Sequence, residues 1–265
     1  MKVAILAGGL GTRLYEETVN RPKALVQIGG QPIIWHIMMH YSSFGFNEFV
    51  IALGYKGQSI VRWMHEYYIS NKNVTVKENS REVLFYDKSR KRQAGWRVHL
   101  IATGQKTLTG GRIKRLAQWL NNETFMLTWC DAVSNVDLHA LLKFHFSHRC
   151  LATVTAVRPP PRFGHLKIEG NRVTQFKEKA QDMEGWINGA FFVLEPEVFD
   201  YIEGDNTQWE KEPMEKLARE GQLIAYRHYG YWRCMDTLKE KLLLEELWRT
   251  GRAPWKTWKD GETTC

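Results

Sequence analysis

The sequence predicts an α/β fold, in which a mostly parallel, Rossmann-like twisted sheet carries helices on both faces. Short apolar runs at residues 3–7, 49–53 and 125–129 have the composition of buried strands. Segments with helical spacing of apolar residues separate these runs, and such alternation is typical of a parallel sheet. In sheets of this kind, ligands bind outside the carboxyl ends of the strands.

The first half of the chain supplies most of this alternation. Pro32 suits the first position of a helix, because its fixed φ fits and its missing N–H is not needed there. The apolar face of that helix comprises Ile33, Ile34, Ile37, Met38 and Tyr41. The other elements expected between this helix and residue 129 are strands at 49–53, 74–84, 96–102 and 125–129 and helices at 59–69 and 112–120.

The second half contains fewer clear signals. Strands are expected at 151–157 and 186–194, on either side of a proline-rich break. A final helix should begin at Thr237, which forms a capping box with Glu240, and end at Gly251. Its expected apolar face comprises Leu238, Leu242 and Leu247. Because we find no internal repeat and no clear linker, we expect a single domain with an elaborated C-terminal part.

Composition excludes several classes of protein. The chain has 265 residues, 43% of them hydrophobic and 25% charged, as in ordinary globular proteins. No apolar run is long enough to span a bilayer. The first strand follows Met1 and Lys2 directly, so we predict no targeting peptide and a cytoplasmic location. The four cysteines lack metal-site spacing and are expected to be reduced thiols.

The chain is basic, with a formal net charge of +8. Part of this excess lies in the run at residues 88–92, which has the character of a solvated loop. A basic surface also suits small polyanionic substrates. We therefore expect neither nucleic acid nor a membrane as a partner.

A glycine-rich loop follows the first strand. The strand ends with Leu6 and Ala7, and the loop contains Gly8, Gly9, Gly11, Thr12 and Arg13. Glycines permit positive φ and bring bare N–H groups against a ligand. Arg13 adds a forked cationic donor, and Lys23 adds a mobile charge, both suited to phosphate oxygens. The pattern indicates a nucleoside triphosphate site.

Two familiar glycine motifs are excluded. A dinucleotide-binding loop needs a glycine where this chain has Leu14, and no Gly-Lys-Ser/Thr follows to make a P-loop. A tight strand-to-helix turn with incidental glycines is the structural alternative. Asp131 follows the strand at 125–129, so the same sheet edge could carry a carboxylate beside the phosphate donors.

Taken together, these residues resemble the sugar-1-phosphate nucleotidyltransferases and, among them, the glucose-1-phosphate cytidylyltransferases. The glycine loop is the superfamily signature, and later segments resemble the cytidylyl branch over nearly the whole chain. These segments are Gly54-Tyr-Lys-Gly57, Thr109-Gly-Gly-Arg112, Glu178-Lys179, Asn188-Gly189, Trp209-Glu-x-Glu-Pro213 and Met235-Asp-Thr237. The resemblance implies a glycosyltransferase-A-like nucleotidyltransferase fold. It divides the domain at 1–265 into a nucleotide-binding part at 1–150 and an acceptor-binding and C-terminal part at 151–265.

The resemblance also implies an activity and its site residues. A sugar phosphate oxygen would attack the α-phosphorus of CTP, and pyrophosphate would leave. Arg13, Lys23, Asp131 and Asp236 would be catalytic, and the two aspartates would hold Mg²⁺. The residues implied for nucleotide binding are Leu6, Ala7, Gly8, Gly9, Gly11, Thr12, Arg13, Lys23, Thr103, Thr109 and Arg112. The residues implied for acceptor binding are Glu178, Lys179, Asn188 and Gly189. A homo-oligomer is also implied.

Several of these residues have a plain structural alternative. Asp131 could cap a turn, Lys179 and Glu178 could form a surface pair, and Arg112 could be a solvated residue on a basic helix. The chain also departs from the family pattern at Cys130, Ala132, Lys167, Ala180 and Cys234. These positions surround the metal and acceptor residues. The acceptor could therefore be glucose 1-phosphate, another phosphorylated or phosphonate molecule, or none in a catalytically weak paralogue.

Overall fold

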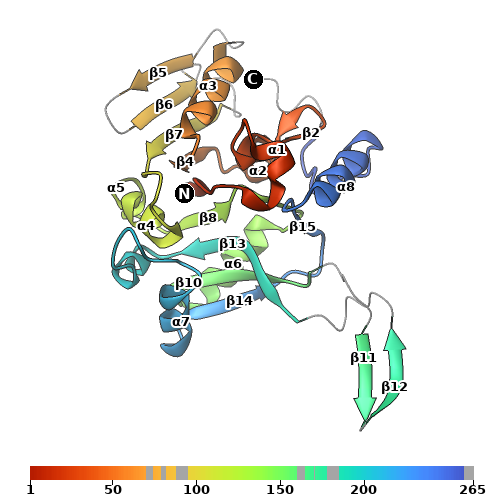
Figure 1. Ribbon diagram of the computed structural model, residues 1–265. Coiled ribbons are helices and arrows are strands. Elements are labelled where there is room, and N and C mark those ends of the chain that lie inside the picture. Colours follow the sequence, from red (N-terminus) through yellow and green to blue (C-terminus); the bar gives the residue numbers. More distant parts are fainter. Residues whose placement is uncertain are drawn as a thin grey trace.

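The computed structural model describes residues 1–69, 74–78, 82–87, 95–159, 165–169, 171–177 and 185–259. In this part of the chain, one nine-stranded sheet forms the centre of the molecule (Figure 1). Its strands, in spatial order, are β14 (Leu223–Arg227), β10 (Ala152–Val157), β13 (Ile187–Leu194), β8 (Phe125–Trp129), β1 (Val3–Ala7), β4 (Glu48–Leu53), β7 (Arg97–Ala102), β6 (Glu82–Asp87) and β5 (Val74–Glu78).

Most strands of this sheet run in one direction. β1 pairs in parallel with both β4 and β8, β4 with β7, and β10 with β14. Only β13 and β6 run the other way, and each pairs antiparallel with both of its neighbours. The sheet is therefore mixed and mainly parallel, which confirms the predicted α/β class.

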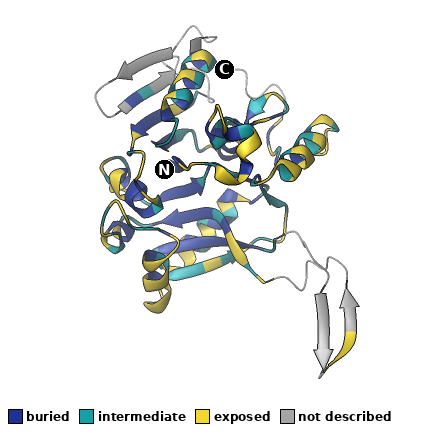
Figure 2. Ribbon diagram, in the orientation of Figure 1, coloured by how far each residue is buried: buried dark blue, intermediate teal, exposed yellow. Residues whose placement is uncertain are grey.

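Helices cover both faces of the sheet, and alternate residues of β1 point to opposite faces. Val3 and Ile5 belong to one core cluster, with α2 (Ile33–Ser43), α3 (Gly57–Ile69), α6 (Leu138–His148) and α8 (Leu238–Arg249). Ala4 and Leu6 belong to the other, with α4 (Thr109–Arg115), α5 (Ala117–Leu120), η4 (Pro196–Tyr201) and α7 (Glu212–Arg219). The central strands are accordingly buried (Figure 2).

Three of the expected elements differ in detail. Pro32 is the N-cap of α2, with extended backbone at ψ 148°, so the helix begins one residue later. The strand expected at 74–84 is two antiparallel strands, β5 and β6. The helix expected at 112–120 is divided at Leu116 into α4 and α5, and α4 begins at Thr109.

The final helix, α8, begins with the predicted capping box between Thr237 and Glu240. Its packed face differs from the expected one: Leu244 is buried, whereas Leu238 and Leu242 are 37% and 55% exposed. This face of the helix lies against the segment around Gly29. Glycine is required there, because φ is +60° and a Cβ would lie 1.9 Å from the Trp248 ring.

Short pairs of strands complete the fold. β2 (Gln27–Ile28) pairs with β3 (Gln31–Pro32), and β9 (Ala132–Ser134) pairs with β15 (Trp232–Cys234). β11 (His165–Glu169) and β12 (Arg172–Lys177) form a hairpin that projects from the body of the molecule (Figure 1). None of the described helices is long and apolar enough to cross a membrane.

Candidate active site

The glycine loop and Asp131 lie side by side at one edge of the sheet. β1 and β8 are parallel neighbours, and Leu6 of β1 is opposite Trp129 of β8. The chain continues from Ala7 into the glycine loop and from Trp129 into Cys130 and Asp131. The register therefore brings backbone donors and a carboxylate to the same place, as expected for carboxyl ends of parallel strands.

Two glycines of the loop are required by the structure itself. A Cβ on Gly8 would lie 2.3 Å from the Arg112 guanidinium carbon. Gly11 has φ +68°, a left-handed conformation that residues with a side chain rarely adopt. The Thr18 hydroxyl donates a hydrogen bond to the Gly11 carbonyl, 2.9 Å away, and fixes this turn. The shape of the loop is thus set by the protein around it.

Arg112 supports the loop from behind. Its side chain is buried, and Nη2 donates to the Gly8 carbonyl at 3.1 Å. Nη1 donates to the Thr103 hydroxyl at 2.7 Å and to the Gly104 and Leu53 carbonyls at 2.8 and 3.1 Å. Burial lowers the pKa of Arg112, and the nearby charge of Arg115 lowers it further. The guanidinium joins the ends of β1, β4 and β7, so it is not the solvated residue of the alternative interpretation.

A short antiparallel ladder brings Asp131 and Asp236 together. Asp131 immediately precedes β9, and Asp236 follows β15 after one residue, Met235. Cys234 pairs with Ala132, and the Met235 amide donates to the Asp131 carbonyl at 2.8 Å. The Asp236 amide donates to Glu240 Oε2 of the capping box at 2.8 Å. Hydrogen bonds therefore fix the backbone of both aspartates beside the ladder.

Two cations contact these carboxylates. Lys23 Nζ is 2.9 Å from Asp131 Oδ2 and 2.5 Å from Asp236 Oδ1. Arg13 Nη1 is 2.7 Å from Asp236 Oδ2. Burial lowers the pKa of Lys23, but the charges and hydrogen bonds of Asp131 and Asp236 outweigh it and raise the pKa above its ordinary value. Lys23 is therefore an ammonium at neutral pH.

The paired carboxylates fit a magnesium ion that is bound in part by its substrate. A cation, the Lys23 ammonium, already bridges them. No group of three or more His, Cys, Asp or Glu suited to a metal occurs among the described residues. Mg²⁺ is commonly held by one or two carboxylates together with phosphate oxygens and water. The donor set is thus sufficient for a metal that a triphosphate helps to bind.

Two cavities meet at this point. We call the larger one, of about 850 Å³, the glycine-loop cavity; residues of the loop, Lys23 and α4 line it. The smaller one, of about 440 Å³, is the ladder cavity, because Ala132, Trp232 and Cys234 of the β9–β15 ladder line it. Trp129, Asp131 and Glu210 line both cavities and form their shared wall.

The structure places most of the residues implied by the resemblance in these cavities. The glycine-loop cavity is lined by Leu6, Ala7, Gly8, Gly9, Gly11, Thr12, Arg13, Lys23, Thr109, Arg112 and Asp131. The ladder cavity is lined by Asn188, Asp131 and Asp236. Thr103 is fully buried behind the loop, where its hydroxyl donates to the Leu53 carbonyl. Gly189 accepts a hydrogen bond from Trp232 Nε1 at 2.7 Å. Glu178 and Lys179 lie outside the described residues.

Glu210 lies in the shared wall and was not singled out by the sequence. Its Oε2 accepts from the Thr109 hydroxyl at 2.6 Å, and its Oε1 accepts from Trp129 Nε1 at 3.1 Å. The carboxylate therefore connects the start of α4 to the strand that precedes Asp131. The segment Trp209-Glu-x-Glu-Pro213 was the available signal, but nothing in it distinguishes Glu210 from Glu212.

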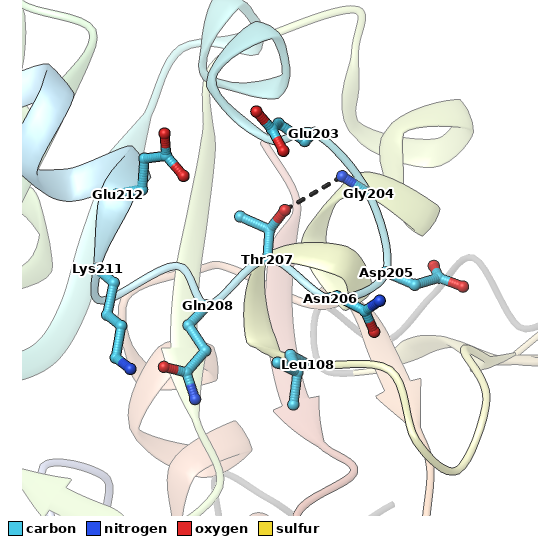
Figure 3. Close-up of a pocket in the computed structure, with 9 residues that line it drawn as sticks. All are labelled: Leu108, Glu203, Gly204, Asp205, Asn206, Thr207, Gln208, Lys211 and Glu212. Atoms are coloured by element: carbon cyan, nitrogen blue, oxygen red, sulfur yellow. Dashed lines mark hydrogen bonds between the residues drawn. The ribbon is translucent and has the colours of Figure 1, made fainter.

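Another cavity, of about 650 Å³, lies beside the glycine-loop cavity. Figure 3 shows it between Leu108 and the segment at 203–212, with the Gly204 amide donating to the Thr207 hydroxyl at 3.1 Å. Leu108 and Gln208 line both this cavity and the glycine-loop cavity. Gly110 and Gly111 let α4 approach this segment, since Cβ atoms there would lie 2.8 and 2.5 Å from backbone atoms of Thr207 and Asp205.

Three departures from the family pattern lie beside the carboxylates: Cys130 and Ala132 flank Asp131, and Cys234 precedes Asp236 by two residues. Cys130 is buried, and burial raises the pKa of its thiol to about 12. Cys234 is opposite Ala132 in the ladder, and burial raises the pKa of its thiol to about 11. Both thiols are protonated at neutral pH; Cys130 packs as a small apolar group, and the Cys234 thiol donates to Glu240 Oε1 at 3.8 Å. Lys167 lies in β11, and Ala180 is outside the described residues.

Comparison with known proteins agrees with this geometry. The nucleotidyl transferase family model matches residues 2–233. The chain is 47% identical to glucose-1-phosphate cytidylyltransferase from Salmonella typhi, over 98% of this chain and 100% of that one. It is 41% identical to a probable glucose-1-phosphate cytidylyltransferase from Bacillus subtilis (strain 168), over 97% and 100%.

Solved structures show the same fold at low sequence identity. The crystal structure of HddC from Yersinia pseudotuberculosis superimposes with a TM-score of 0.68 at 21% identity, covering 93% of this chain and 99% of that one. The sequence matches and the site together establish the relationship. The chain belongs to the nucleotidyl transferase family, as an enzyme of the glucose-1-phosphate cytidylyltransferase branch.

Proposed function

We propose that the protein transfers a cytidylyl group from CTP to glucose 1-phosphate, forming CDP-glucose and pyrophosphate. The observation that carries this proposal is the meeting of the two cavities at Asp131, beside Lys23 and Arg13. A transfer between two bound phosphates needs such a junction. The similarity to glucose-1-phosphate cytidylyltransferases supports the choice of base and acceptor.

The glycine-loop cavity would bind the nucleotide. Arg13, Lys23 and Lys106 line it, and these cations can neutralise a triphosphate. A Cβ on Gly9 would meet no atom within 4 Å, so the protein leaves open space there. This glycine suits the close approach of a phosphate to the backbone. Thr109 and the braced Arg112 would support the nucleotide from α4.

The ladder cavity would bind the acceptor. Asn188 offers an amide at its edge, and Trp232 offers an indole ring. Glu178 and Lys179 follow β12 in the sequence and belong, by the family resemblance, to the same function. Residues 1–150 and 151–265 would then supply the nucleotide and acceptor sides of one domain.

No side-chain nucleophile is needed for this reaction, because the acceptor phosphate is already an anion. One of its oxygens forms a bond to the α-phosphorus of CTP, and the bond from that phosphorus to the bridging oxygen of pyrophosphate breaks. Arg13 and Lys23 hold the phosphates in line and neutralise the developing charge. A magnesium ion bound by Asp131 and Asp236 would add positive charge at the same phosphates.

A panel assay tests this function. The enzyme is incubated with Mg²⁺, each of the four nucleoside triphosphates and several phosphorylated or phosphonate acceptors, and pyrophosphate release is measured. We expect the highest kcat/KM with CTP and glucose 1-phosphate. Turnover with only another acceptor would replace the acceptor assignment. Such acceptors are included because Ala132 and Cys234, which depart from the family pattern, line the ladder cavity. Binding of CTP without turnover would indicate a catalytically weak paralogue.

The homo-oligomeric state and the cytoplasmic location remain predictions. Sedimentation of the purified protein and fractionation of cells test them.

A further inference from the structure

The Lys23 ammonium lies between the two carboxylates that would hold a divalent ion. Nζ lies 2.9 Å from Asp131 Oδ2 and 2.5 Å from Asp236 Oδ1. The second oxygen of Asp236 is engaged by Arg13 Nη1 at 2.7 Å. A metal ion that used both aspartates would therefore compete with the protein's own cations for the same oxygen atoms.

This competition is strong because the pair is shielded from water. The side chains of Lys23 and Asp236 are only 11% and 14% exposed. Charges at contact distance in such a setting interact much more strongly than on an exposed surface. A divalent ion placed beside a retained ammonium would be repelled by it, so the ion can enter only if Lys23 moves.

The protein alone offers a metal ion little compensation for this displacement. The described residues contain no group of three or more His, Cys, Asp or Glu suited to a metal. An Mg²⁺ ion at the two aspartates would take its remaining ligands from water and from substrate oxygens. Without nucleotide, the ion would displace an internal ion pair and gain only two carboxylates.

A triphosphate changes this balance, because it provides new partners for both cations. Arg13 and Lys23 line the glycine-loop cavity, where phosphate oxygens would lie under the function proposed above. If the Lys23 ammonium turns to a phosphate, Asp131 and one oxygen of Asp236 are released to a metal. The same phosphates then complete the coordination of that metal.

We propose that Lys23 is an internal cation that excludes divalent metal from the Asp131–Asp236 site until nucleotide binds. Metal and nucleotide therefore load together, and the metal-free site is held assembled by Lys23. This inference rests on the proposed triphosphate site, but it concerns a step before any chemistry.

The test measures Mn²⁺ binding to the nucleotide-free protein by electron paramagnetic resonance of the free ion. Lys23→Met should bind Mn²⁺ at least about tenfold more tightly than the wild type. Lys106→Met is the matched control, because Lys106 lines the same cavity and its loss removes the same charge. Lys106→Met should change the Mn²⁺ affinity by no more than about twofold, as expected for loss of a charge that does not contact the two aspartates. When Asp131→Asn is added to Lys23→Met, the gain in Mn²⁺ affinity should disappear, which would show that the ion binds at Asp131.

Thermal unfolding gives an independent readout. Without Lys23, Asp131 loses its cation and only Arg13 still neutralises Asp236, so Lys23→Met should have a lower Tm that Mn²⁺ restores. The Tm of the wild type should not respond to Mn²⁺ alone. Lys23→Gln, which keeps a neutral polar side chain of similar length, should respond in the same way and serves if the methionine variant does not fold.

Equal Mn²⁺ affinity of Lys23→Met and Lys106→Met would overturn the inference, as would tight Mn²⁺ binding by the nucleotide-free wild type. The outcome is separate from that of the proposed function. If the wild type turns over CTP but Lys23→Met gains no Mn²⁺ affinity, only the proposed role of Lys23 is rejected and the proposed function stands. A gain without turnover on any acceptor would reject the function and leave the role of Lys23 in place.

Discussion

The glycine-loop cavity and the ladder cavity share Trp129, Asp131 and Glu210, but the rest of their linings differ in kind. The first is lined by the whole glycine loop and by the cations Arg13, Lys23 and Lys106, together with the segment 105–109 and Arg112. The second is formed mainly by short or apolar side chains of the ladder and β13. The buried guanidinium of Arg112 donates one hydrogen bond to the loop, at the Gly8 carbonyl, and four more to Leu53 and to the segment 103–105.

This difference indicates how each side can vary. A site built from backbone binds what all nucleoside triphosphates share, and it tolerates changes in neighbouring side chains. A site built from side chains changes its ligand when they change. Ala132 and Cys234, which replace family residues, line the ladder cavity, whereas Cys130 lines the glycine-loop cavity beside Asp131. We therefore expect variation of the acceptor to be easier than variation of the triphosphate grip.

The largest effect is expected at the shared wall, where a substitution impairs both sides together. Asp131→Asn should lower kcat by about 10²–10³-fold, because it removes a charge that acts on the transferring phosphate. The measurement is steady-state turnover with each substrate varied in turn. Asp200→Asn removes the same charge at an exposed position of η4 and should leave kcat unchanged. Retained turnover in Asp131→Asn would refute the metal assignment.

The sequence predicted the glycine-loop side better than the ladder side. The strands beside the loop are apolar runs of five or six residues, and their end residues fix where the loop begins. β9 and β15 have only three residues each, too short for periodicity to reveal. The proximity of Asp131 and Asp236 was therefore implied by family resemblance and not by pattern.

Arg112 and Glu210 show a second limit of sequence reasoning. Arg112 stands in a basic helix start, where a solvated side chain is the ordinary expectation. It is buried because carbonyl groups from three strand ends, far apart in sequence, converge on it. Glu210 resembles any surface glutamate until the fold places Thr109 and Trp129 beside it. Such partners depend on tertiary structure, which no local pattern contains.

The next largest effect should distinguish the two cavities. Arg112→Met removes the guanidinium donor from the Gly8, Leu53 and Gly104 carbonyls, although Leu53 keeps its bonds from Thr103. We expect a loss of about 2–4 kcal/mol in the free energy of unfolding. The KM for CTP should rise, and the KM for the acceptor should change little. Urea denaturation and initial-rate kinetics measure these effects.

Arg115→Met is the matched control in the same helix. Arg115 forms an exposed ion pair with Asp205, so its loss should cost less than about 1 kcal/mol. If the two variants lose equal stability, the bracing role of Arg112 is refuted. If Arg112→Met raises both KM values equally, the two sides are not independent.

A smaller effect concerns acid, which should lower the free energy of unfolding through the buried His36, away from both cavities. Burial lowers the pKa of His36 to about 4, partly offset by its hydrogen bond to the Ile28 carbonyl. Because the folded pKa lies below the unfolded value, stability is complete above about pH 6.5 and decreases as pH falls toward 4. At pH 5 the loss from this histidine should be roughly 2 kcal/mol.

The comparison of wild type with His36→Gln isolates this contribution, because other groups titrate equally in both. Glutamine can still donate to the Ile28 carbonyl and has no proton to gain. Urea denaturation at pH 7 and pH 5 should therefore show a shallower decrease for the variant. Parallel decreases in the two proteins would mean that His36 is protonated in the folded state without penalty.

The smallest effect tests whether Glu210 couples the two cavities. Glutamine at this position has one acceptor oxygen, so Glu210→Gln keeps the bond from Thr109 or from Trp129 but loses the other. We expect kcat/KM for CTP and for the acceptor to fall together by about three- to tenfold, as for the net loss of one ordinary hydrogen bond. Glu212→Gln, an exposed change in α7, should alter neither value.

A decrease for CTP alone would assign Glu210 to the glycine-loop side, and a decrease for the acceptor alone would assign it to the ladder side. Either result would show that the two cavities are joined functionally at Asp131 only, and that Glu210 belongs to one of them.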